Sequence, residues 1–432
     1  MIFSRIYVLF FFFSPFILVA QTPCALNEKR ELFVDNYFID KLTNVVIKLH
    51  TPIDEGIVFN FDNPWEGDFS GYVTIINDNN LYRLYYRGVK VVDKDGNENE
   101  VTCYAESNDG MNWIKPNLKL HVINETLENN VILANAAPVT HNFTPFFDRN
   151  PNSKHKFKAL GGIKISGLIP YGSNDGVNWD PLQKDAVIKK GVFDSQNVSF
   201  WSESENQYVC YFRVWSNGNF SKYRGYRSIA RTTSKDFINW SEPIQMTFED
   251  TPREHFYTNQ TSPYFRAPHI YVAIGARFMP NRQVLTKEQA VSLNVNPGYF
   301  RDCSDVFLMT SRGDSIFNRL FMEAFIRPGI GLNNWVSRSN YPALNVVQTS
   351  PTEMSLYINQ DYAQPTAHLR RYSLRLDGFT SLNAPDERGM VVTKNFTFSG
   401  KELEINYSTS AAGELKIEIQ DHEGKPIPGF AI

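Results

Sequence analysis

Residues 107–113 read SNDGMNW, and the same phrase returns at residues 173–179 as SNDGVNW. Looser copies follow at residues 233–240 (TSKDFINW), 310–317 (TSRGDSIF) and 374–379 (LRLDGF). The Asn-Asp-Gly step favours a tight turn, because Gly accepts a positive φ and the Asn and Asp side chains hydrogen-bond to nearby backbone. The copies recur at roughly 60–80 residues, the length of a four-stranded propeller blade with long loops. The phrase therefore predicts five repeats of one structural unit.

Alternating apolar and polar residues precede each copy of the phrase and predict three short β-strands there. In the first unit these strands lie at residues 72–77, 81–89 and 101–106. With an outer fourth strand in each unit, the sequence predicts an all-β, five-bladed β-propeller over residues 61–383. Residues 21–60 are interpreted as an N-terminal segment that wraps the propeller or closes its last sheet. Residues 384–432 are predicted to form a small C-terminal β-strand module resembling a β-sandwich.

The composition agrees with many short strands joined by turns, since 14% of the residues are aromatic and the chain has 25 Gly and 23 Pro. A formal net charge of −3 lacks the excess of Lys and Arg that nucleic-acid phosphates require. The 4 Cys residues are too few for a disulfide scaffold, and none forms a Cys-x-x-Cys pair. We therefore predict no nucleic-acid partner, no cofactor and no metal ligands; a structural cation on the propeller axis is the alternative.

The N-terminus carries the pattern of a secretory signal peptide. Arg5 precedes the apolar residues 6–20 (IYVLFFFFSPFILVA), and the polar Gln21 follows them. Cleavage after Ala20 would give a secreted or periplasmic protein, and an uncleaved membrane anchor is the alternative. No later window is long and apolar enough to span a bilayer, and the sequence assigns no oligomeric state.

In a propeller, the innermost strands begin around one mouth of the central channel, so side chains from distant parts of the sequence converge there. The five predicted strand starts all combine polar or charged groups with aromatic rings. They read PWEGDFSGY (64–72), HNFTPFFD (141–148), FDSQN (193–197), PREHFYTNQ (252–260) and NWVSRSN (334–340). We expect these five segments to form one site.

The signal peptide, the five aromatic-rich units and the acidic residues at the strand starts resemble the five-bladed glycosidases of glycoside hydrolase families 32, 43, 62, 68 and 117. More narrowly, the phrases PWEGDFSGYVT, HNFTPF, FDSQN, PREHFYTNQ and LEINYSTSAAG resemble secreted family-32 N-terminal-like proteins over nearly all of the mature chain. The Asn-Asp-Pro-Asn-Gly, Arg-Asp-Pro and Glu-Cys motifs of family 32 itself are absent. The resemblance implies a five-bladed propeller that acts on carbohydrate.

Glycosidic cleavage needs one carboxylic acid that protonates the leaving oxygen and one carboxylate that activates water or attacks carbon. The resemblance implies Asp68 as the base or nucleophile, because related propellers carry theirs at the first inner strand. Glu66 is the alternative at that strand. Glu254 is the predicted general acid. Asp194 is the runner-up for that role, or a third carboxylate that orients the sugar.

A further set of residues at the strand starts is predicted to bind substrate: Trp65, Glu66, His141, Asn142, Arg253, His255, Tyr257, Asn259, Trp335 and Arg338. Trp65, Tyr257 and Trp335 offer aromatic faces for sugar rings. His141 can contact hydroxyl groups or donate a proton, since its unperturbed pKa lies near ~6.5. Arg338 suits a carboxylated or sulfated sugar, because a guanidinium group binds such anions with two parallel hydrogen bonds.

The sequence therefore predicts a secreted glycoside hydrolase that acts on a plant or algal poly- or oligosaccharide by carboxylate acid/base catalysis. One competing hypothesis is a non-catalytic carbohydrate-binding propeller. Another is a polysaccharide lyase, in which His141 or Tyr257 takes a proton beside a uronate carboxylate held by Arg338. The aspartates of the repeated phrase are assigned to turns.

Overall fold

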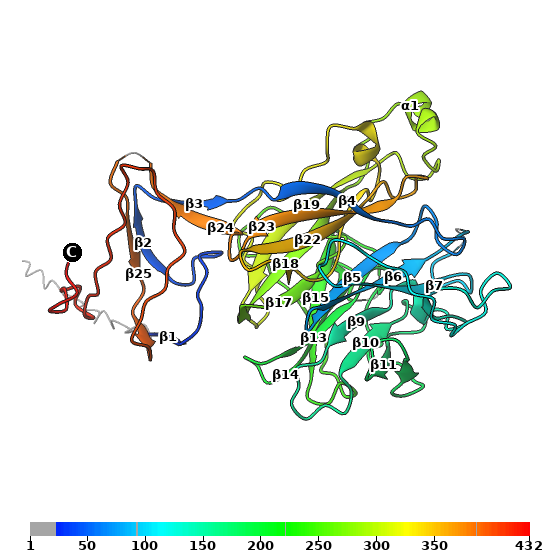
Figure 1. Ribbon diagram of the computed structural model, residues 1–432, viewed down its shortest axis with the longest axis horizontal. Coiled ribbons are helices and arrows are strands. Elements are labelled where there is room, and N and C mark those ends of the chain that lie inside the picture. The colour runs from blue at the N-terminus through cyan, green and yellow to red at the C-terminus, as the bar shows by residue number, and fades with distance from the viewer. Residues whose placement is uncertain (1–22, 92–93, 221, 386) are drawn as a thin grey trace, which may run out of the picture.

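The computed structural model describes residues 23–91, 94–220, 222–385 and 387–432, so the predicted signal peptide at residues 1–20 lies outside the described residues. In these ranges the chain forms five large β-sheets around a common axis (Figure 1). Inner strands of neighbouring sheets pack together, and a parallel bridge between Thr74 and Leu344 joins the fifth sheet to the first. The predicted all-β, five-bladed propeller is confirmed.

The first three blades are four-stranded antiparallel sheets in chain order. Their strands are β5 (Gly71–Asp78), β6 (Leu81–Gly88), β7 (Val101–Ser107) and β8 (Val131–Leu133) in blade one; β9 (Thr144–Phe147), β10 (Phe157–Gly161), β11 (Ile169–Ser173) and β12 (Asp180–Pro181) in blade two; and β13 (Val198–Ser202), β14 (Gln207–Trp215), β15 (Arg227–Ser234) and β16 (Ile244–Gln245) in blade three.

The last two blades depart from this plan. Blade four contains β17 (Thr261–Tyr264), β18 (Ala267–Met279) and β19 (Cys303–Ser311), and isolated bridges from β19 to Asn318 and Ile326 take the place of an outer strand. Blade five contains β20 (Asn340–Pro342), β21 (Val347–Gln348), β22 (Glu353–Gln360) and β23 (His368–Arg375). Its outer strand is β4 (Ile53–Asn60), from the N-terminal segment, so residues from both ends of the propeller share one sheet.

The repeated phrase forms the same turn in each of the first three blades. In the second copy, Asp175 Oδ1 accepts the backbone N–H groups of Val177 and Asn178, each at 2.8 Å. Burial favours the protonated carboxyl, but these bonds outweigh it and lower the pKa of Asp175 to about 2. Asp109 and Asp236 accept the equivalent N–H groups in their own blades. The structure thus confirms that these aspartates serve the turns.

The glycine of the phrase also lets neighbouring blades interlock. Gly176 has φ +77°, and a Cβ there would lie 2.6 Å from the Tyr85 hydroxyl of blade one. Tyr85 instead donates a hydrogen bond to the Gly176 carbonyl at 2.9 Å, and Trp179 packs edge-on against the same ring. Tyr357 of blade five donates to the Gly110 carbonyl in the same way. The phrase therefore sets both a turn and the spacing between blades.

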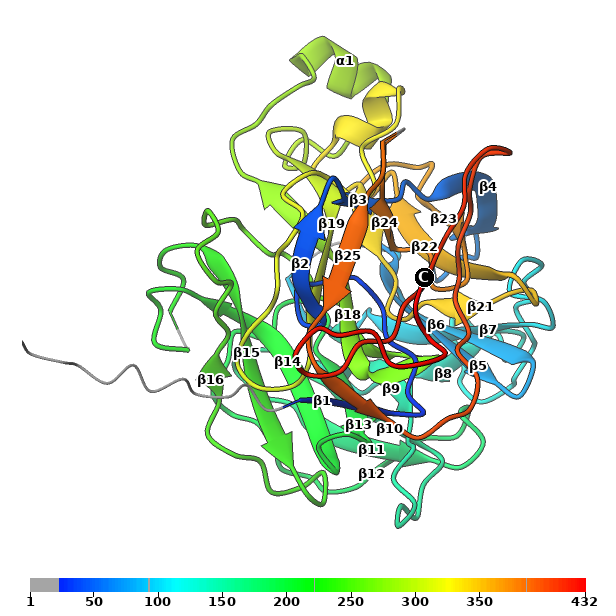
Figure 2. The same ribbon diagram turned by 90° about the vertical axis from the view of Figure 1, so that its left-hand side faces the viewer.

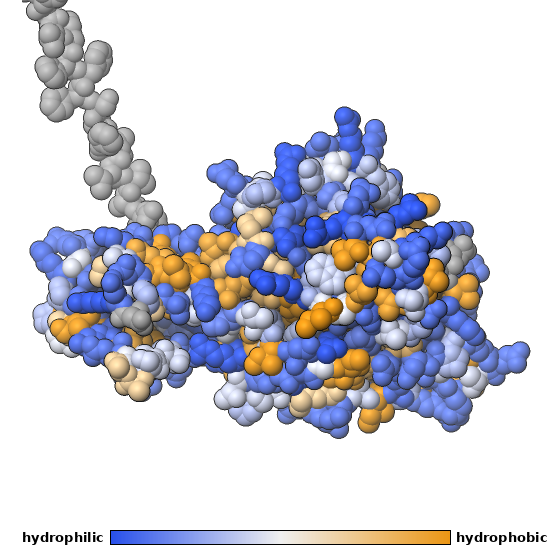
Figure 3. Space-filling view, turned by 90° about the horizontal axis from the view of Figure 1, so that it is seen from above, coloured by the Kyte–Doolittle hydropathy of each residue, from blue (hydrophilic) through white to orange (hydrophobic). Residues whose placement is uncertain are grey.

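Outside the propeller, N-terminal and C-terminal strands pair to form an extension to one side (Figures 1 and 2). It contains the pairs β1 (Cys24–Asn27) with β26 (Phe396–Phe398), β2 (Ile39–Thr43) with β25 (Met390–Thr393), and β3 (Val46–Leu49) with β24 (Thr380–Asn383). Residues 399–432 hold no strand beyond an isolated bridge between Gln420 and Pro426, where further strands were expected. The C-terminal residues thus add to small sheets shared with the N-terminus. Figure 3 shows apolar surface on this extension and on the adjoining propeller.

The described residues contain little helix. The α-helix α1 (Lys287–Ser292) begins after Thr286, which forms a capping box with Gln289. No helix in the described ranges has the length and apolar character needed to cross a membrane.

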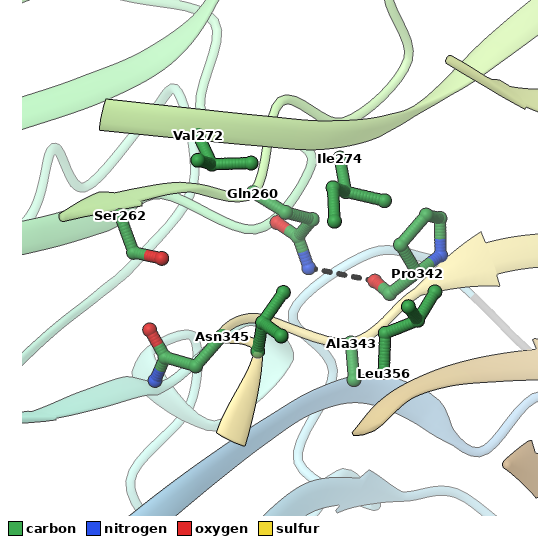
Figure 4. A pocket seen from close by; sticks show the side chains of 9 residues that line it. Gln260, Ser262, Val272, Ile274, Pro342, Ala343, Asn345 and Leu356 are labelled. Atoms are coloured by element: carbon green, nitrogen blue, oxygen red, sulfur yellow. Dashed lines mark hydrogen bonds between the residues drawn. The ribbon is translucent and has the colours of Figure 1, made fainter. Parts of the chain in front are cut away.

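Between blades four and five lies a narrow gap, shown in Figure 4. Gln260 Nε2 crosses it and donates to the Pro342 carbonyl at 2.8 Å (Figure 4). The gap has a volume of about 10 Å³, which suffices for about one water molecule. It belongs to the packing between blades.

Candidate active site

A cavity of about 120 Å³ opens at the propeller axis, an order of magnitude larger than the gap between blades. All five blades contribute to its wall. The side chains on which its chemistry depends are Tyr72 and Arg87 from blade one, His141 from blade two, Asp194, Arg213 and Arg227 from blade three, Tyr257 before blade four, and Arg338 and Tyr362 around blade five. The cavity is therefore the site towards which the strand starts were predicted to converge.

The backbone at this cavity is unusual. Tyr72, Phe193 and Arg338 lie at or shortly before inner strands and have φ values of +52°, +54° and +63°. Positive φ is unfavourable for bulky side chains and persists only where the surrounding structure enforces it, often at functional sites. The structure thus enforces this backbone at the entry to three different blades, and two of the three residues, Tyr72 and Arg338, line the cavity.

Two arginines of the cavity are paired with carboxylates. Arg213, buried on β14, donates from Nε to Asp194 Oδ1 at 3.0 Å. Arg87, buried on β6, lies 3.8 Å from Glu100 Oε1 and donates to the Phe69 carbonyl at 2.9 Å. Each pair leaves little net charge, so these two arginines add little to the positive character of the cavity.

Two other arginines of the cavity have no carboxylate partner within the described ranges. Arg227 and Arg338 are partly buried, and the Nε atom of each is buried without a hydrogen-bond acceptor there. Both stack on the Tyr257 ring, with guanidinium carbons 5.5 Å and 5.3 Å from its centroid. Cation–π contacts of this kind hold a guanidinium group in place but leave its N–H donors available. The cavity therefore carries unneutralised positive charge.

Tyr257 is a titratable group of the cavity whose pKa is lowered by neighbouring arginines. Its side chain is buried and stacks on Tyr341, with ring centroids 5.0 Å apart. Burial alone would raise the pKa of its phenol, but the charges of Arg338 and Arg213 outweigh burial and lower the pKa to about 8. A phenol with such a pKa can give or take a proton near neutral pH.

His141 ends a short 3-10 turn, η1 (Val139–His141), directly before blade two. Its Nδ1 atom lies 3.0 Å from Glu100 Oε1 and 3.2 Å from the Gly96 amide nitrogen. Its Nε2 atom is buried and has no partner among the residues described by the structure. The carboxylate side of the ring is thus fixed, and the other nitrogen remains available to a ligand.

Four predicted site residues meet at the cavity: His141, Asp194, Tyr257 and Arg338. Each comes from the start of a different blade, from two to five. Blade one contributes Phe69 and Tyr72 instead of the expected Asp68. Asp68 is partly exposed and burial raises the pKa of its carboxyl, while its backbone carbonyl accepts a hydrogen bond from Ala363. Its side chain does not line the cavity.

Glu254 also lies away from the cavity wall. Its Oε1 accepts from Arg277 at 2.6 Å and its Oε2 from Arg319 at 3.1 Å. Arg277 also binds Asp305 on the neighbouring strand β19. Both oxygens of Glu254 are thus held by blade four itself, so the three proposed catalytic carboxylates do not face one cavity.

The remaining predicted residues have other contacts in the structure. Trp65 donates a hydrogen bond to Asn130 in the core, Asn142 donates to the Phe193 and Ser195 carbonyls, and Trp335 donates to the Gly329 carbonyl. Asn259 accepts a hydrogen bond from the Thr261 backbone, and His255 accepts one from the Arg227 amide. Glu66 forms an ion pair with Lys115, and Arg253 is exposed. None of these seven lines the cavity.

The residues missed from the sequence are Arg87, Arg213 and Arg227, which lie on second and third strands. The first two had a usable signal: Arg213 is the single charge in the strand QYVCYFRVW, and Arg87 is one of two arginines in the otherwise apolar and aromatic strand LYRLYYRG. A charge buried in such a strand requires a partner or a function. No cluster of three or more His, Cys, Asp or Glu side chains suited to a metal ion occurs in the described part of the chain.

No known protein family and no curated protein sequence matches this chain. Solved structures with a similar fold include a glycoside hydrolase, 10% identical, with a TM-score of 0.47, covering 75% of this chain and 92% of that one. An N-acetylgalactosamine deacetylase from F. plautii, in complex with blood group B trisaccharide, is 12% identical, with a TM-score of 0.47 and coverage of 77% and 96%. An α-L-arabinanase from Penicillium chrysogenum, complexed with arabinobiose, is 9% identical, with a TM-score of 0.43 and coverage of 76% and 99%. These are likenesses of fold at low identity and assign the chain to no family.

Proposed function

We propose that this protein is an enzyme that cleaves an acidic glycan in the axial cavity, by β-elimination beside a uronate carboxylate. The observation that carries the proposal is the arrangement of Arg227 and Arg338 on the ring of Tyr257, without carboxylate partners in the described ranges. Guanidinium groups bind carboxylates through parallel, charge-assisted hydrogen bonds. A uronate carboxylate supplies the negative charge that the cavity lacks, whereas a neutral sugar leaves both arginines unpaired.

Elimination needs a base next to the bound carboxylate. The Tyr257 phenolate takes the proton from the carbon that bears the carboxylate, the bond from the adjacent carbon to the leaving oxygen breaks, and a carbon–carbon double bond forms between the two carbons. Arg227 and Arg338 stabilise the negative charge that develops on the carboxylate during proton removal. The leaving oxygen takes a proton from His141 Nε2, an atom with no hydrogen-bond partner in the described part of the protein.

Hydrolysis, which the sequence favoured, has less support from the geometry. It requires two carboxyl groups on opposite sides of the glycosidic bond. Of Asp68, Asp194 and Glu254, only Asp194 lines the cavity, and it already accepts a hydrogen bond from Arg213. Asp95 and Glu100 line the cavity as well, and Glu100 Oε1 lies 3.0 Å from His141 Nδ1. Elimination instead uses the groups that do meet there.

The proposal also places the protein outside the cytoplasm, secreted or in a periplasm. This rests on the apolar segment at residues 6–20 and the polar residues that follow it. Polymeric uronates from plant or algal walls are substrates of a kind that a cell meets only outside its own cytoplasm.

The test is a screen of uronate-rich, sulfated and neutral polysaccharides, with ultraviolet absorbance and reducing ends measured in parallel. Elimination releases reducing ends together with an absorbing unsaturated sugar, and Tyr257→Phe should abolish both while sugar binding persists. Asp68→Asn is the matched control, because Asp68 does not line the cavity. Reducing ends without absorbance, lost in Asp68→Asn, would establish hydrolysis instead. Sugar binding with no released ends would identify a binding propeller.

A further inference from the structure

We infer that the hairpin between β14 and β15 forms a second subsite, which binds the next acidic sugar of an extended chain. This rests on the proposed function and adds to it that the substrate is an oligomer with at least two anionic residues. The subsite consists of Trp215, Tyr223, Tyr226 and His255, called here the aromatic ledge, together with the basic residues beside it.

The hairpin is ordered by its own hydrogen bonds. The Ser216 amide donates to the Tyr226 carbonyl at 2.8 Å, and the Asn217 amide donates to the Arg224 carbonyl at 3.0 Å. Gly225 has φ +91°, and a Cβ there would lie 2.4 Å from Ser216 Oγ. These contacts hold residues 216 and 217 beside residues 224–226, at the base of the hairpin.

The aromatic ledge presents exposed rings on a rigid base. Tyr223 is 55% exposed and packs edge-on against Trp215, with centroids 5.9 Å apart. Tyr226 is 40% exposed and lies 4.8 Å from the ring of His255. Single aromatic rings scattered over a surface are ordinary. Exposed rings that gather next to a cavity instead indicate a binding surface.

Basic residues lie beside the ledge. Lys164, from blade two, places Nζ 5.0 Å from the centroid of the Tyr223 ring. Lys222 and Arg224 lie on the hairpin itself and are exposed. None of these three forms an ion pair with a carboxylate in the described ranges. Aromatic faces beside free cations match a sugar ring that carries a carboxylate or a sulfate.

The ledge is continuous with the axial cavity. Arg227, the first residue of β15, lines the cavity and places its guanidinium carbon 4.8 Å from the centroid of Trp215. Tyr223 also lies near Asp194, Arg213 and Asp95, whose charges act on its phenol and which all line the cavity. One acidic sugar at Arg227 and Arg338 therefore leaves its neighbour above the ledge.

The experiment uses the uronate polymer that the wild-type chain cleaves, supplied as its disaccharide and its hexasaccharide. Tyr223→Ala should raise KM for the hexasaccharide by about tenfold, the loss expected for one aromatic contact, with kcat unchanged. The disaccharide should be little affected, because its two sugars are the leaving group and the uronate held by Arg227 and Arg338, and neither reaches the ledge. Lys164→Gln should raise the same KM and reduce its dependence on salt. Tyr407→Ala, an exposed tyrosine (60%) of the C-terminal segment, is the matched control.

Equal kinetics of Tyr223→Ala and wild type on both lengths would overturn the second subsite and leave the elimination proposal intact. A wild-type chain that neither binds nor cleaves any acidic glycan would overturn the proposed function and the subsite with it. Folding of Tyr223→Ala is checked by its thermal midpoint, which a change at an exposed side chain should leave close to that of the wild type.

Discussion

Replacing Arg338 by Met should raise the pKa of the Tyr257 phenol and slow the reaction that uses its phenolate. The usual pKa of 10.0 falls to about 8 in this cavity. That difference of about two pH units corresponds to about 3 kcal/mol in favour of the phenolate. Arg338 and Arg213 lower the pKa against the opposing effect of burial, and Arg338 is the larger of the two causes. Arg338→Met should therefore reduce the phenolate present at pH 7 about tenfold.

The shift can be measured without any substrate, from the ultraviolet absorbance that appears when a tyrosine ionises. Subtracting the titration of Tyr257→Phe from that of the wild type isolates one tyrosine, and its midpoint should lie near pH 8. In Arg338→Met the isolated step should move upward by about one pH unit. In kinetic assays, kcat/KM reports the ionisation of groups in the free enzyme, so it should rise with pH through the same midpoint. A bound uronate cancels part of the arginine charge, so kcat should show a higher apparent pKa than kcat/KM.

Two results would refute this reasoning. The first is a step near pH 8 that persists in Tyr257→Phe, because another tyrosine would then be responsible for it. The second is a Tyr257 step that stays in place in Arg338→Met, because the low pKa would then have a cause other than the arginine. Arg253→Met is the matched control, since this exposed arginine lies outside the cavity wall and should leave the titration unchanged.

Three further substitutions separate the site from the scaffold. Arg227→Met should weaken binding of an acidic sugar by about tenfold or more, since a hydrogen bond to a charged group contributes about 1.5–3 kcal/mol; unchanged affinity in calorimetry would contradict the anion site. Glu254→Gln should lower the free energy of unfolding by about 3 kcal/mol in a denaturant titration, because Arg277 and Arg319 lose their shared carboxylate, while sugar affinity stays the same. Asp175→Ala should cost about 1 kcal/mol through lost turn hydrogen bonds, seen as a small fall in thermal midpoint at full activity.

The fold was predictable from the sequence because each blade carries its own local signal. The Asn-Asp-Gly turn is specified by residues adjacent in the chain, and Asp175 satisfies the same amides that the sequence pattern implies. The start of an inner strand is a local feature too. Once five blades were predicted, the convergence of His141, Tyr257 and Arg338 followed from the topology alone.

The choice among the acidic residues could not be made from the sequence, because it depends on partners far away in the chain. Glu254 is bound outside the cavity wall by Arg277 and Arg319, which follow it in the chain by 23 and 65 residues. Asp194 stays at the cavity because Arg213 reaches it from β14. Nothing in the sequence near either carboxylate distinguishes these outcomes. The site was predicted only from the starts of inner strands, whereas the arginines lie on second and third strands.

The charge of the cavity argues for an acidic substrate more directly than any likeness to other propellers. Its two arginine–carboxylate pairs are close to neutral, and Lys94 and Asp95 in its wall carry opposite charges, so Arg227 and Arg338 leave a net positive charge. Partial burial of such groups costs free energy, and the pKa of Arg227 is lowered by burial and by repulsion from Arg213. A bound carboxylate removes this repulsion, whereas a neutral sugar displaces water from the guanidinium groups without replacing it by a negative charge. Acidic ligands should accordingly raise the thermal midpoint of the protein, and neutral analogues of the same size should not.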